Sequence, residues 1–317
     1  MFLCVSPNPA IDKRIALRAL VPGEIHRART AHNFAGGKAT HVAMVLKALG
    51  SDPHWIGMCG GAAGEHVIAG LRTLGIVPHS VPVAGETRTN LEILDDLGQV
   101  TEIREPGELV SSEEVAAFER ECAQLFATGG EARVAAFSGS LPPDAPDDLY
   151  ARLIMSARNS GCRTFLDASG EPLRAALSAR PDFVKPNREE AGAIVNFAID
   201  SNDAAAEAVR ELILLGARSA AVSLGRSGMI YGPGENAPIY FAPAVPIGPL
   251  STVGCGDAAL AGFAYASCSG ASPPEALRKA AACAAANCLA ESPGAVRAEL
   301  VQEFEAQVRV ETFLAAP

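Results

Sequence analysis

Residues 251–258 read Ser251-Thr252-Val253-Gly254-Cys255-Gly256-Asp257-Ala258 and lead into an alanine-rich apolar segment, Asp257–Ser267. Glycine lets the backbone turn tightly, so the two glycines can place consecutive N–H groups at the start of a helix. Such a helix end favours negative charge, because its unpaired donors and the helix dipole act together. The stretch therefore indicates an anion site with Asp257 in the first turn or, more simply, an aspartate that caps a helix after a glycine turn.

Short apolar runs alternate with segments of helical period along most of the chain. Gly50 and Gly75 supply two helix ends, and Ser111 with Glu114 forms a capping-box pattern. The predicted strands are Phe2–Ser6, His54–Met58, Arg133–Ser138, Arg163–Asp167, Asp182–Lys185 and Ala220–Leu224. The predicted helices are Lys38–Leu49, Glu65–Leu74, Val115–Phe126, Asp147–Asn159, Asn187–Val195, Ala204–Leu215, Asp257–Ser267, Pro274–Leu289 and Glu299–Val308. This alternation predicts an α/β fold with a mainly parallel sheet and helices on both faces.

Two regions, Lys13–Phe34 and Thr87–Glu105, lack helical periodicity. Within the second, Thr89–Asp95 and Val100–Arg104 alternate polar and apolar residues, with Leu97-Gly98 as a turn between them. We expect an antiparallel hairpin outside the main sheet. With no repeat or linker in the chain, the organisation predicted is one large α/β domain (1–12, 35–86 and 106–317) with a discontinuous β-sheet lid (13–34 and 87–105).

The composition bounds the classes of partner. The 317 residues are 49% hydrophobic and 20% charged, which is typical of a folded chain with a substantial core. A net charge of −10 argues against nucleic-acid and anionic-membrane partners, and no apolar run reaches the roughly 18 residues of a membrane span. The start, MFLCVSPNPA, lacks the pattern of a secretory signal. Eight cysteines without a CxxC pair suggest reduced thiols in a cytoplasmic protein rather than a zinc site.

A second pair of glycines occurs in Ala35-Gly36-Gly37-Lys38, where a ligand could approach the backbone beside a positive charge. It is not a P-loop, because the spacing G-x-x-x-x-G-K-[ST] is absent from the chain. An ordinary junction between a loop and a helix would give the same pattern. Ser138-Gly139-Ser140-Leu141-Pro142 ends a predicted strand, which is where open parallel sheets bind ligands.

Two further motifs follow predicted strands, and each has a simple structural alternative. In Lys185-Pro186-Asn187-Arg188-Glu189-Glu190, Asn187 and Glu190 share a helical face and either hold a hydrated Mg²⁺ or form a capping box. Ser223-Leu224-Gly225-Arg226-Ser227-Gly228 either cradles a nucleotide or forms a hairpin. Arg88 and Asn90, which open the isolated hairpin, are ordinary surface residues when each is taken alone.

The order of the motifs is more specific than any one of them. Asp12 in Asn8-Pro9-Ala10-Ile11-Asp12 comes first, and the series then runs through GGK, RTN, SGSLPP, KPN-x-x-E, SLG-x-x-G and G-x-GD. In this order the motifs resemble the PfkB (ribokinase-like) sugar kinase family over about residues 2–295. The resemblance is to its phosphosugar branch, which contains 1-phosphofructokinase, tagatose-6-phosphate kinase and the minor 6-phosphofructokinase. Three further segments support this resemblance: Gly60-Gly61-Ala62-Ala63-Gly64-Glu65-His66, Thr101-Glu102-Ile103-Arg104-Glu105-Pro106-Gly107 and Asp167-Ala168-Ser169-Gly170-Glu171.

The resemblance implies a ribokinase-like three-layer α/β/α sandwich and ATP-dependent phosphorylation of a hydroxyl of a hexose phosphate. Asp257 would be the general base, and the N–H groups of Gly254, Cys255 and Gly256 would form an anion hole. Asn187 and Glu190 would hold Mg²⁺ through water. The implied sugar-side residues are Asp12, Arg27, Gly36, Gly37, Lys38, His41, Arg88, Asn90, Arg104 and Ser138. The implied ATP-side residues are Lys185, Asn187, Ser223, Gly225, Gly228 and Asn287.

The resemblance also implies a homodimer formed through the lid, and K⁺ as a further cofactor beside Ile247–Val253 and Ala290–Gly294. Arg27 and Arg88 would grip the phosphate that the substrate already carries, because the guanidinium fork suits phosphate geometry. Arg27, Lys38, Arg88, Arg104 and Lys185 would then concentrate positive charge in one cleft.

The sequence departs from the family pattern at three places. His41 and Ala39 stand in GGK-Ala39-Thr40-His41 where the family reads GGKG-x-N, so the identity of the sugar is open. Cys255 replaces an alanine, and a cysteine whose pKa is lowered by a helix N-terminus would be oxidisable. Ala258 replaces a serine. Two alternatives to a hexose-phosphate kinase remain: a kinase of an unphosphorylated sugar or nucleoside, and a non-catalytic sensor of sugar phosphate with the same fold.

Overall fold

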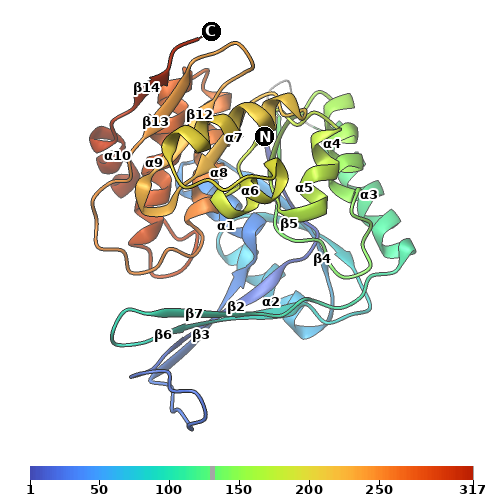
Figure 1. Ribbon diagram of the computed structural model, residues 1–317. Helices are drawn as coiled ribbons and strands as arrows, with labels where there is room; N and C mark the ends of the chain where they lie inside the picture. Colours follow the sequence, from blue (N-terminus) through green and yellow to red (C-terminus); the bar gives the residue numbers. More distant parts are fainter. Residues whose placement is uncertain (129–132, 317) are drawn as a thin grey trace.

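Two sheets organise the computed structural model, which describes residues 1–128 and 133–316 (Figure 1). The large sheet has ten strands in the order β14-β13-β12-β11-β10-β9-β8-β1-β4-β5. Its strands are β1 (Phe2–Ser6), β4 (Pro53–Cys59), β5 (Val77–Pro82), β8 (Val134–Ser138), β9 (Arg163–Asp167), β10 (Phe183–Val184), β11 (Ala220–Ser223), β12 (Met229–Gly232), β13 (Ile239–Ala242) and β14 (Glu311–Leu314). The pairs from β11 to β5 are parallel, and β12, β13 and β14 add an antiparallel edge.

Helices cover both faces of the large sheet, because successive side chains of a strand point to opposite sides. In β1, Leu3 and Val5 join one core and Phe2 and Cys4 join the other. The first core contains α3 (Ser112–Ala127), α4 (Leu149–Asn159), α5 (Gly170–Leu177), α6 (Arg188–Val195) and α7 (Asn202–Leu214). The second contains α1 (Lys38–Ala48), α2 (Gly61–Thr73), α8 (Cys255–Cys268), α9 (Pro273–Cys288) and α10 (Ala298–Gln307). The α/β class and the three layers are confirmed.

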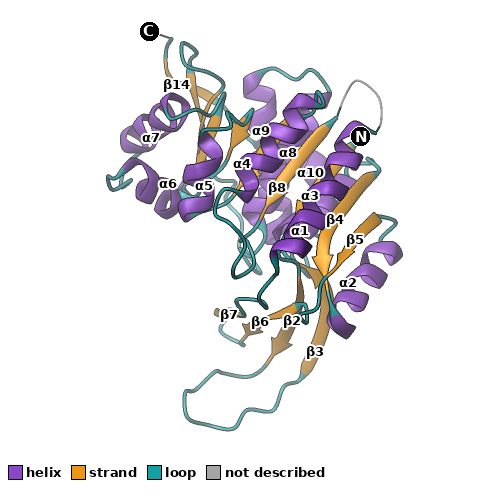
Figure 2. Ribbon diagram, turned by 90° about the vertical axis from the view of Figure 1, so that its right-hand side faces the viewer, coloured by secondary structure: helices purple, strands orange, loops and turns teal. Residues whose placement is uncertain are grey.

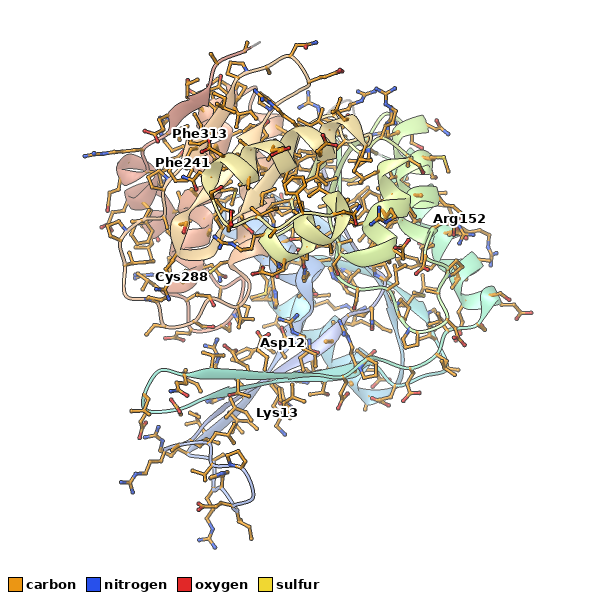
Figure 3. The ribbon with its side chains drawn as sticks, viewed as in Figure 1. Asp12, Lys13, Arg152, Phe241, Cys288 and Phe313 are labelled. Atoms are coloured by element: carbon orange, nitrogen blue, oxygen red, sulfur yellow. The ribbon has the colours of Figure 1, made fainter. Side chains whose placement is uncertain are left out.

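The small sheet has four strands in the order β3-β2-β6-β7 and projects from one end of the large body (Figures 1 and 2). Its strands are β2 (Ala10–Ala16), β3 (Thr30–Gly36), β6 (Arg88–Leu94) and β7 (Val100–Arg104). β6 and β7 form the antiparallel hairpin predicted, while β2 pairs parallel to β6. Asp12 faces the large body and its neighbour Lys13 points away from it (Figure 3). Alternation along β2 therefore selects which side chains reach the space between the two sheets.

Several elements differ from the predicted bounds. α2 begins at Gly61 rather than Glu65, because Gly-Gly-Ala-Ala carries no apolar period to reveal its first turn. β10 has two residues instead of four, and β5, β12, β13, β14 and α5 were not predicted. The capping box of Ser111 and Glu114 is present at the start of α3. No helix among residues 1–128 and 133–316 is long and apolar enough to cross a membrane.

Candidate active site

A cleft of about 1650 Å³ lies where the large sheet meets the small one. Its floor is built at the carboxyl ends of parallel strands, where Gly139 follows β8, Asp167 ends β9 and Lys185 follows β10. This edge is the ligand-binding edge of open parallel sheets, because the loops there diverge to neighbouring helices. Strands β2, β6 and β7 of the small sheet supply the opposite wall.

A histidine lies between two carboxylates inside the cleft. His41 Nε2 is 2.7 Å from Asp12 Oδ2, and His41 Nδ1 is 2.8 Å from Asp257 Oδ2. Burial alone would lower the pKa of His41, but hydrogen bonds to the two carboxylates outweigh it and raise the pKa to about 10. Burial alone would raise the pKa of Asp12, but hydrogen bonds from His41 and Asn90 lower it below its usual range. The group therefore carries a buried positive charge between two negative ones.

Asp12 approaches the backbone closely, and Gly36 makes room for it. A Cβ at position 36 would lie 2.3 Å from the Asp12 carboxyl carbon, so no larger residue fits without moving that carboxylate. Asp12 Oδ1 accepts from Asn90 Nδ2 at 2.9 Å. The amide oxygen of Asn90 is buried and has no hydrogen-bond partner within the described residues. An acceptor left open beside Asp12 suits a ligand that brings its own donors, such as the hydroxyls of a sugar.

Asp167 joins two lysines on the floor of the cleft. Its Oδ2 is 2.9 Å from Lys185 Nζ, and its Oδ1 is 3.1 Å from Lys38 Nζ. Burial lowers the pKa of Lys38, but Asp167, Asp257 and Glu190 outweigh it, so that the pKa is raised. Lys38 therefore stays charged. Asp167 thereby holds two ammonium groups on the floor of the cleft, and that of Lys185 lies beside Gly256 at the start of α8.

The start of α8 presents backbone donors to the cleft. Gly254 is the N-cap with φ at +79°, a conformation that favours glycine. The Cys255 N–H donates to the Thr252 carbonyl at 3.3 Å, whereas the N–H groups of the next two residues precede the first possible i to i−4 partner. Gly254, Cys255, Gly256 and Asp257 all line the cleft. The geometry is that of an anion site with one carboxylate beside it.

The side chain of Cys255 meets a second thiol, that of Cys288. Their Sγ atoms are 3.1 Å apart, and Asn287 Nδ2 lies 3.4 Å from Cys255 Sγ. The hydrogen bond with Cys288 and burial raise the pKa of Cys255, whereas the same hydrogen bond lowers the pKa of Cys288. The expectation of a lowered pKa at Cys255 is therefore wrong, because the neighbouring thiol and burial raise this pKa.

Asn187 and Glu190 form a capping box at the start of α6, which is one of the two interpretations that the sequence allows. The Glu190 N–H donates to Asn187 Oδ1 at 2.8 Å, and the Asn187 N–H donates to Glu190 Oε2 at 2.9 Å. Glu190 Oε1 remains toward the cleft, 3.9 Å from Lys38 Nζ. Within residues 1–128 and 133–316, no group of three or more His, Cys, Asp or Glu could hold a metal ion by itself. A cation that keeps most of its water, as Mg²⁺ does, fits this arrangement.

Two of the three arginines predicted on the sugar side line the cleft. Arg88 donates to the carbonyls of Glu105 and Asn8, both at 3.0 Å, and its buried Nε has no partner within the described residues. Arg104 lies on the neighbouring strand β7, where it pairs with Asn90 of β6. Arg27 lies exposed in the connection between β2 and β3 and does not line the cleft of its own chain.

The remaining predicted residues divide between the cleft and the core. Ser223, Gly225 and Gly228 line the cleft around a 3₁₀ turn, Gly225–Ser227. Ser138 is buried and does not line it. Asn287 is buried, and its amide donates to the Val253 carbonyl at 2.7 Å and accepts from the Gly294 N–H at 2.8 Å. Those bonds join the loops before α8 and after α9, and Asn287 does not line the cleft.

A protein-family model with the description pfkB family carbohydrate kinase matches residues 7–299 of this chain. The chain belongs to the pfkB family. It is 36% identical over 269 residues to 1-phosphofructokinase of Xanthomonas campestris pv. campestris, with 83% of each protein covered. It is 30% identical over 313 residues to tagatose-6-phosphate kinase of Staphylococcus epidermidis, with 98% of this chain and 99% of the relative covered.

A solved structure supports the same family. Phosphofructokinase-2 from Escherichia coli in complex with potassium matches with a TM-score of 0.89 and 27% identity, over 97% of this chain and 98% of that one. The prediction of a ribokinase-like fold is thereby confirmed, together with the small second sheet.

Some cleft residues of this pfkB chain were not predicted from its sequence. Asp167 is one, although it ends a predicted strand, and a carboxylate at the carboxyl end of a parallel strand is a usable signal. Glu92 is another, since its alternation in β6 gave only a strand. An apolar wall was also missed, because isolated alanines, prolines and valines carry no motif. Its members are Pro243, Ala244, Val245, Pro246, Ile247, Ala281, Ala284 and Ala285.

Proposed function

We propose that this chain transfers the terminal phosphoryl group of ATP to a hydroxyl of a hexose phosphate, with Asp257 as the general base. The observation that carries the proposal is the position of Asp257 in the first turn of α8, beside the first backbone N–H groups of that helix and lining the cleft. A carboxylate there can take the hydroxyl proton while the helix end stabilises charge on the transferring group. Asp257 Oδ1 makes no hydrogen bond within the described residues, because the bond to His41 uses Oδ2.

The sugar side is assigned to the wall made by the small sheet. Asp12 and Asn90 offer acceptors to sugar hydroxyls, and Gly37 and Lys38 line the cleft next to them. Arg88 and Arg104 would hold the phosphate that the substrate already carries, since a guanidinium matches phosphate oxygens in pairs. A neutral sugar or a nucleoside gives these arginines no partner, which disfavours the first alternative.

The ATP side is assigned to the other half of the cleft. The apolar wall from Pro243 to Ile247 and on α9 suits a purine ring. Ser223, Gly225 and Gly228, at the end of β11 and in the turn after it, would contact the phosphates. Lys185 adds positive charge on the floor. Asn187 and Glu190 would hold Mg²⁺ through water, and bound Mg²⁺ would neutralise the charge of the ATP phosphates.

Three further assignments complete the proposal. K⁺ would act beside Ile247–Val253 and Ala290–Gly294, two segments that Asn287 joins by hydrogen bonds. A homodimer would form through the lid, on which Ile25, Leu97 and Ile103 are exposed. We place the protein in the cytoplasm, since all eight cysteines are free, as is usual in a reducing compartment.

The substrate is tested by assaying ADP release with fructose 1-phosphate, fructose 6-phosphate, tagatose 6-phosphate and the unphosphorylated sugars. The proposal expects turnover with at least one hexose phosphate and much weaker turnover without the phosphate. Turnover only with an unphosphorylated sugar or a nucleoside would favour the first alternative. Sugar-phosphate binding by calorimetry with no turnover would favour a sensor.

The base is tested with Asp257→Ala. We expect turnover to fall by about 10²- to 10⁴-fold, the range for loss of a general base. ATP affinity, measured by calorimetry, should be nearly unchanged, because the apolar wall and Lys185 are intact. Glu189→Gln is a control that removes another carboxylate lining the cleft. A fully active Asp257→Ala protein would refute the assignment.

A further inference from the structure

His41 is the least expected residue of the cleft, because the family pattern has an asparagine there. It is 5% exposed, and both ring nitrogens are already engaged, Nε2 by Asp12 and Nδ1 by Asp257. A ring with both nitrogens occupied has no donor or acceptor left for a sugar hydroxyl. The role expected from the resemblance, direct contact with the sugar, therefore does not match these contacts.

We propose that His41 is a positively charged positioning residue that holds the Asp12 and Asp257 carboxylates in a fixed relation, and so fixes the general base against the sugar. This inference rests on the proposed function, in which Asp12 binds the sugar and Asp257 takes the proton. An ionised carboxylate only accepts hydrogen bonds, whereas a neutral imidazole has a single N–H. Two acceptors at 2.7 and 2.8 Å are both satisfied only when the ring carries a proton on each nitrogen.

The surroundings of His41 support a fixed bridge. A Cβ on Gly294 would lie 2.9 Å from His41 Cα, so the loop after α9 packs directly against the backbone of this residue. Asn90 Nδ2 holds the other oxygen of Asp12 at 2.9 Å. A base that is misplaced by about 1 Å can cost about 100-fold in rate, which makes such bracing useful.

The charges around the ring come from three elements besides α1. Asp12 lies on β2 and Asp257 on α8, and both face the ring directly. Lys38, one turn earlier in α1, acts on Asp257, while Arg88 on β6 acts on Asp12. Burial opposes the protonated ring, but the two carboxylates outweigh it and raise the pKa of His41 to about 10.

The first test measures the protonation of the His41 ring directly and does not depend on enzyme activity. In the full-length protein labelled with ¹⁵N-histidine, both nitrogens of His41 should be protonated at neutral pH and should titrate near pH 10. His41→Asn identifies the signal by its loss. A ring that carries one proton at neutral pH, or titrates near the ordinary value of 6.5, would overturn the proposal.

The second test measures how catalysis depends on the hydrogen bonds that His41 makes to Asp12 and Asp257. His41→Asn and His41→Gln keep a polar side chain but cannot carry the charge, so we expect kcat to fall about 100-fold, with the KM for ATP unchanged. The wild-type rate should decline as pH rises toward 10, and this decline should be missing from both variants. In both variants Asp12 loses the partner that lowers its pKa, so it should become protonated at a higher pH than in the wild type. As pH is lowered, the KM for the sugar phosphate should therefore begin to rise at a higher pH in the variants than in the wild type.

His66→Asn is the matched control, since His66 lies exposed on α2 and should behave as the wild type. Variants with the wild-type kcat and pH profile would overturn the bridge while leaving the proposed kinase intact. Failure of the wild type on every hexose phosphate would instead overturn the proposed function, and the ¹⁵N measurement would still decide the protonation of the ring.

Discussion

Asp167 is a buried carboxylate that two lysine side chains share. The side chains of Asp167 and Lys185 are each 2% exposed, and their charged atoms are 2.9 Å apart. Asp167→Asn removes the negative charge and leaves the Lys185 ammonium buried without its partner. Because breaking a buried ion pair costs about 3–5 kcal/mol, we expect the free energy of unfolding in urea to fall by about that amount.

The same substitution changes how stability depends on pH. Burial would raise the pKa of Asp167, but Lys185 and Lys38 outweigh it and hold the pKa below its ordinary 3.8. Such a group stabilises the fold above pH 3.8 and loses that effect as pH falls through its folded-state pKa. The difference between wild type and variant should therefore be largest near neutral pH and shrink in acid. Asp52→Asn is the control, since Asp52 pairs with Lys47 at 2.8 Å but is 91% exposed; an equal loss there would contradict the argument from burial.

At the scale of the helices, α8 and α9 meet through two sulfur atoms. α8 begins at Cys255 and α9 ends at Cys288, and the 3.1 Å between the Sγ atoms needs only a small movement to reach the disulfide length of about 2.05 Å. We expect hydrogen peroxide to oxidise the Cys288 thiol, whose pKa is lowered by its hydrogen bond with Cys255, to a sulfenic acid with release of water. The Cys255 thiol then displaces a second water to form the disulfide. The bond would shift the start of α8, which carries Asp257, and turnover should fall.

The check is a thiol titration with turnover measured in parallel. Mild peroxide should remove two thiols per chain together with activity, and dithiothreitol should restore both. Cys288→Ser should stay active under peroxide, whereas Cys268→Ser, which removes an exposed thiol, should remain sensitive. Unchanged turnover of the wild type after oxidation would show that the two cysteines are not a functional pair.

Local sequence patterns were sufficient to predict most of the parallel sheet and its helices. β1 and β9 have the predicted bounds, and α3 has its predicted cap, because apolar period and capping chemistry are properties of adjacent residues. β12, β13 and β14 escaped prediction, since they are four-residue strands at an antiparallel edge. The two-residue β10 is set by its neighbours in the sheet rather than by its own sequence.

The candidate site divides in the same way. Glycines before α1 and α8 marked two helix starts at the cleft, because each motif is continuous in sequence. The bridge through His41 was not predictable, since His41 and Asp257 are 216 residues apart and only the packing of α1 on α8 joins them. The thiol pair, 33 residues apart on two helices, was missed for the same reason.

At the scale of the whole molecule, the chain has a net charge of −10, and the cleft proposed to bind two anionic substrates is not lined by cations alone. Lys38, Arg88, Arg104 and Lys185 line it, as the sequence predicted, but carboxylates line it as well. Those carboxylates are Asp12, Glu92, Glu102, Asp167, Glu189, Glu190 and Asp257. Anion binding in this cleft must therefore depend on where each charge stands, and the small sheet has to be held in register with the large body.

One buried carboxylate connects the small sheet to the large body. Glu92 on β6 accepts from Arg14 on β2 at 2.8 and 2.9 Å, and from Ser251 Oγ in the loop before α8 at 2.9 Å. Arg14 also donates to the carbonyl of Glu291 in the loop after α9.

Glu92→Gln should loosen the small sheet and raise the KM for the sugar phosphate about 10-fold, since a hydrogen bond to a charged group contributes about 1.5–3 kcal/mol. The KM for ATP should change less, and hydrogen exchange should quicken in β2 and β6. Asp96→Asn is the control, because Asp96 and Arg29 pair between two connections of the small sheet, the turn after β6 and the segment before β3. Equal effects of the two variants on KM would mean that the stability of the sheet itself, rather than its attachment to the loops around α8 and α9, governs sugar binding.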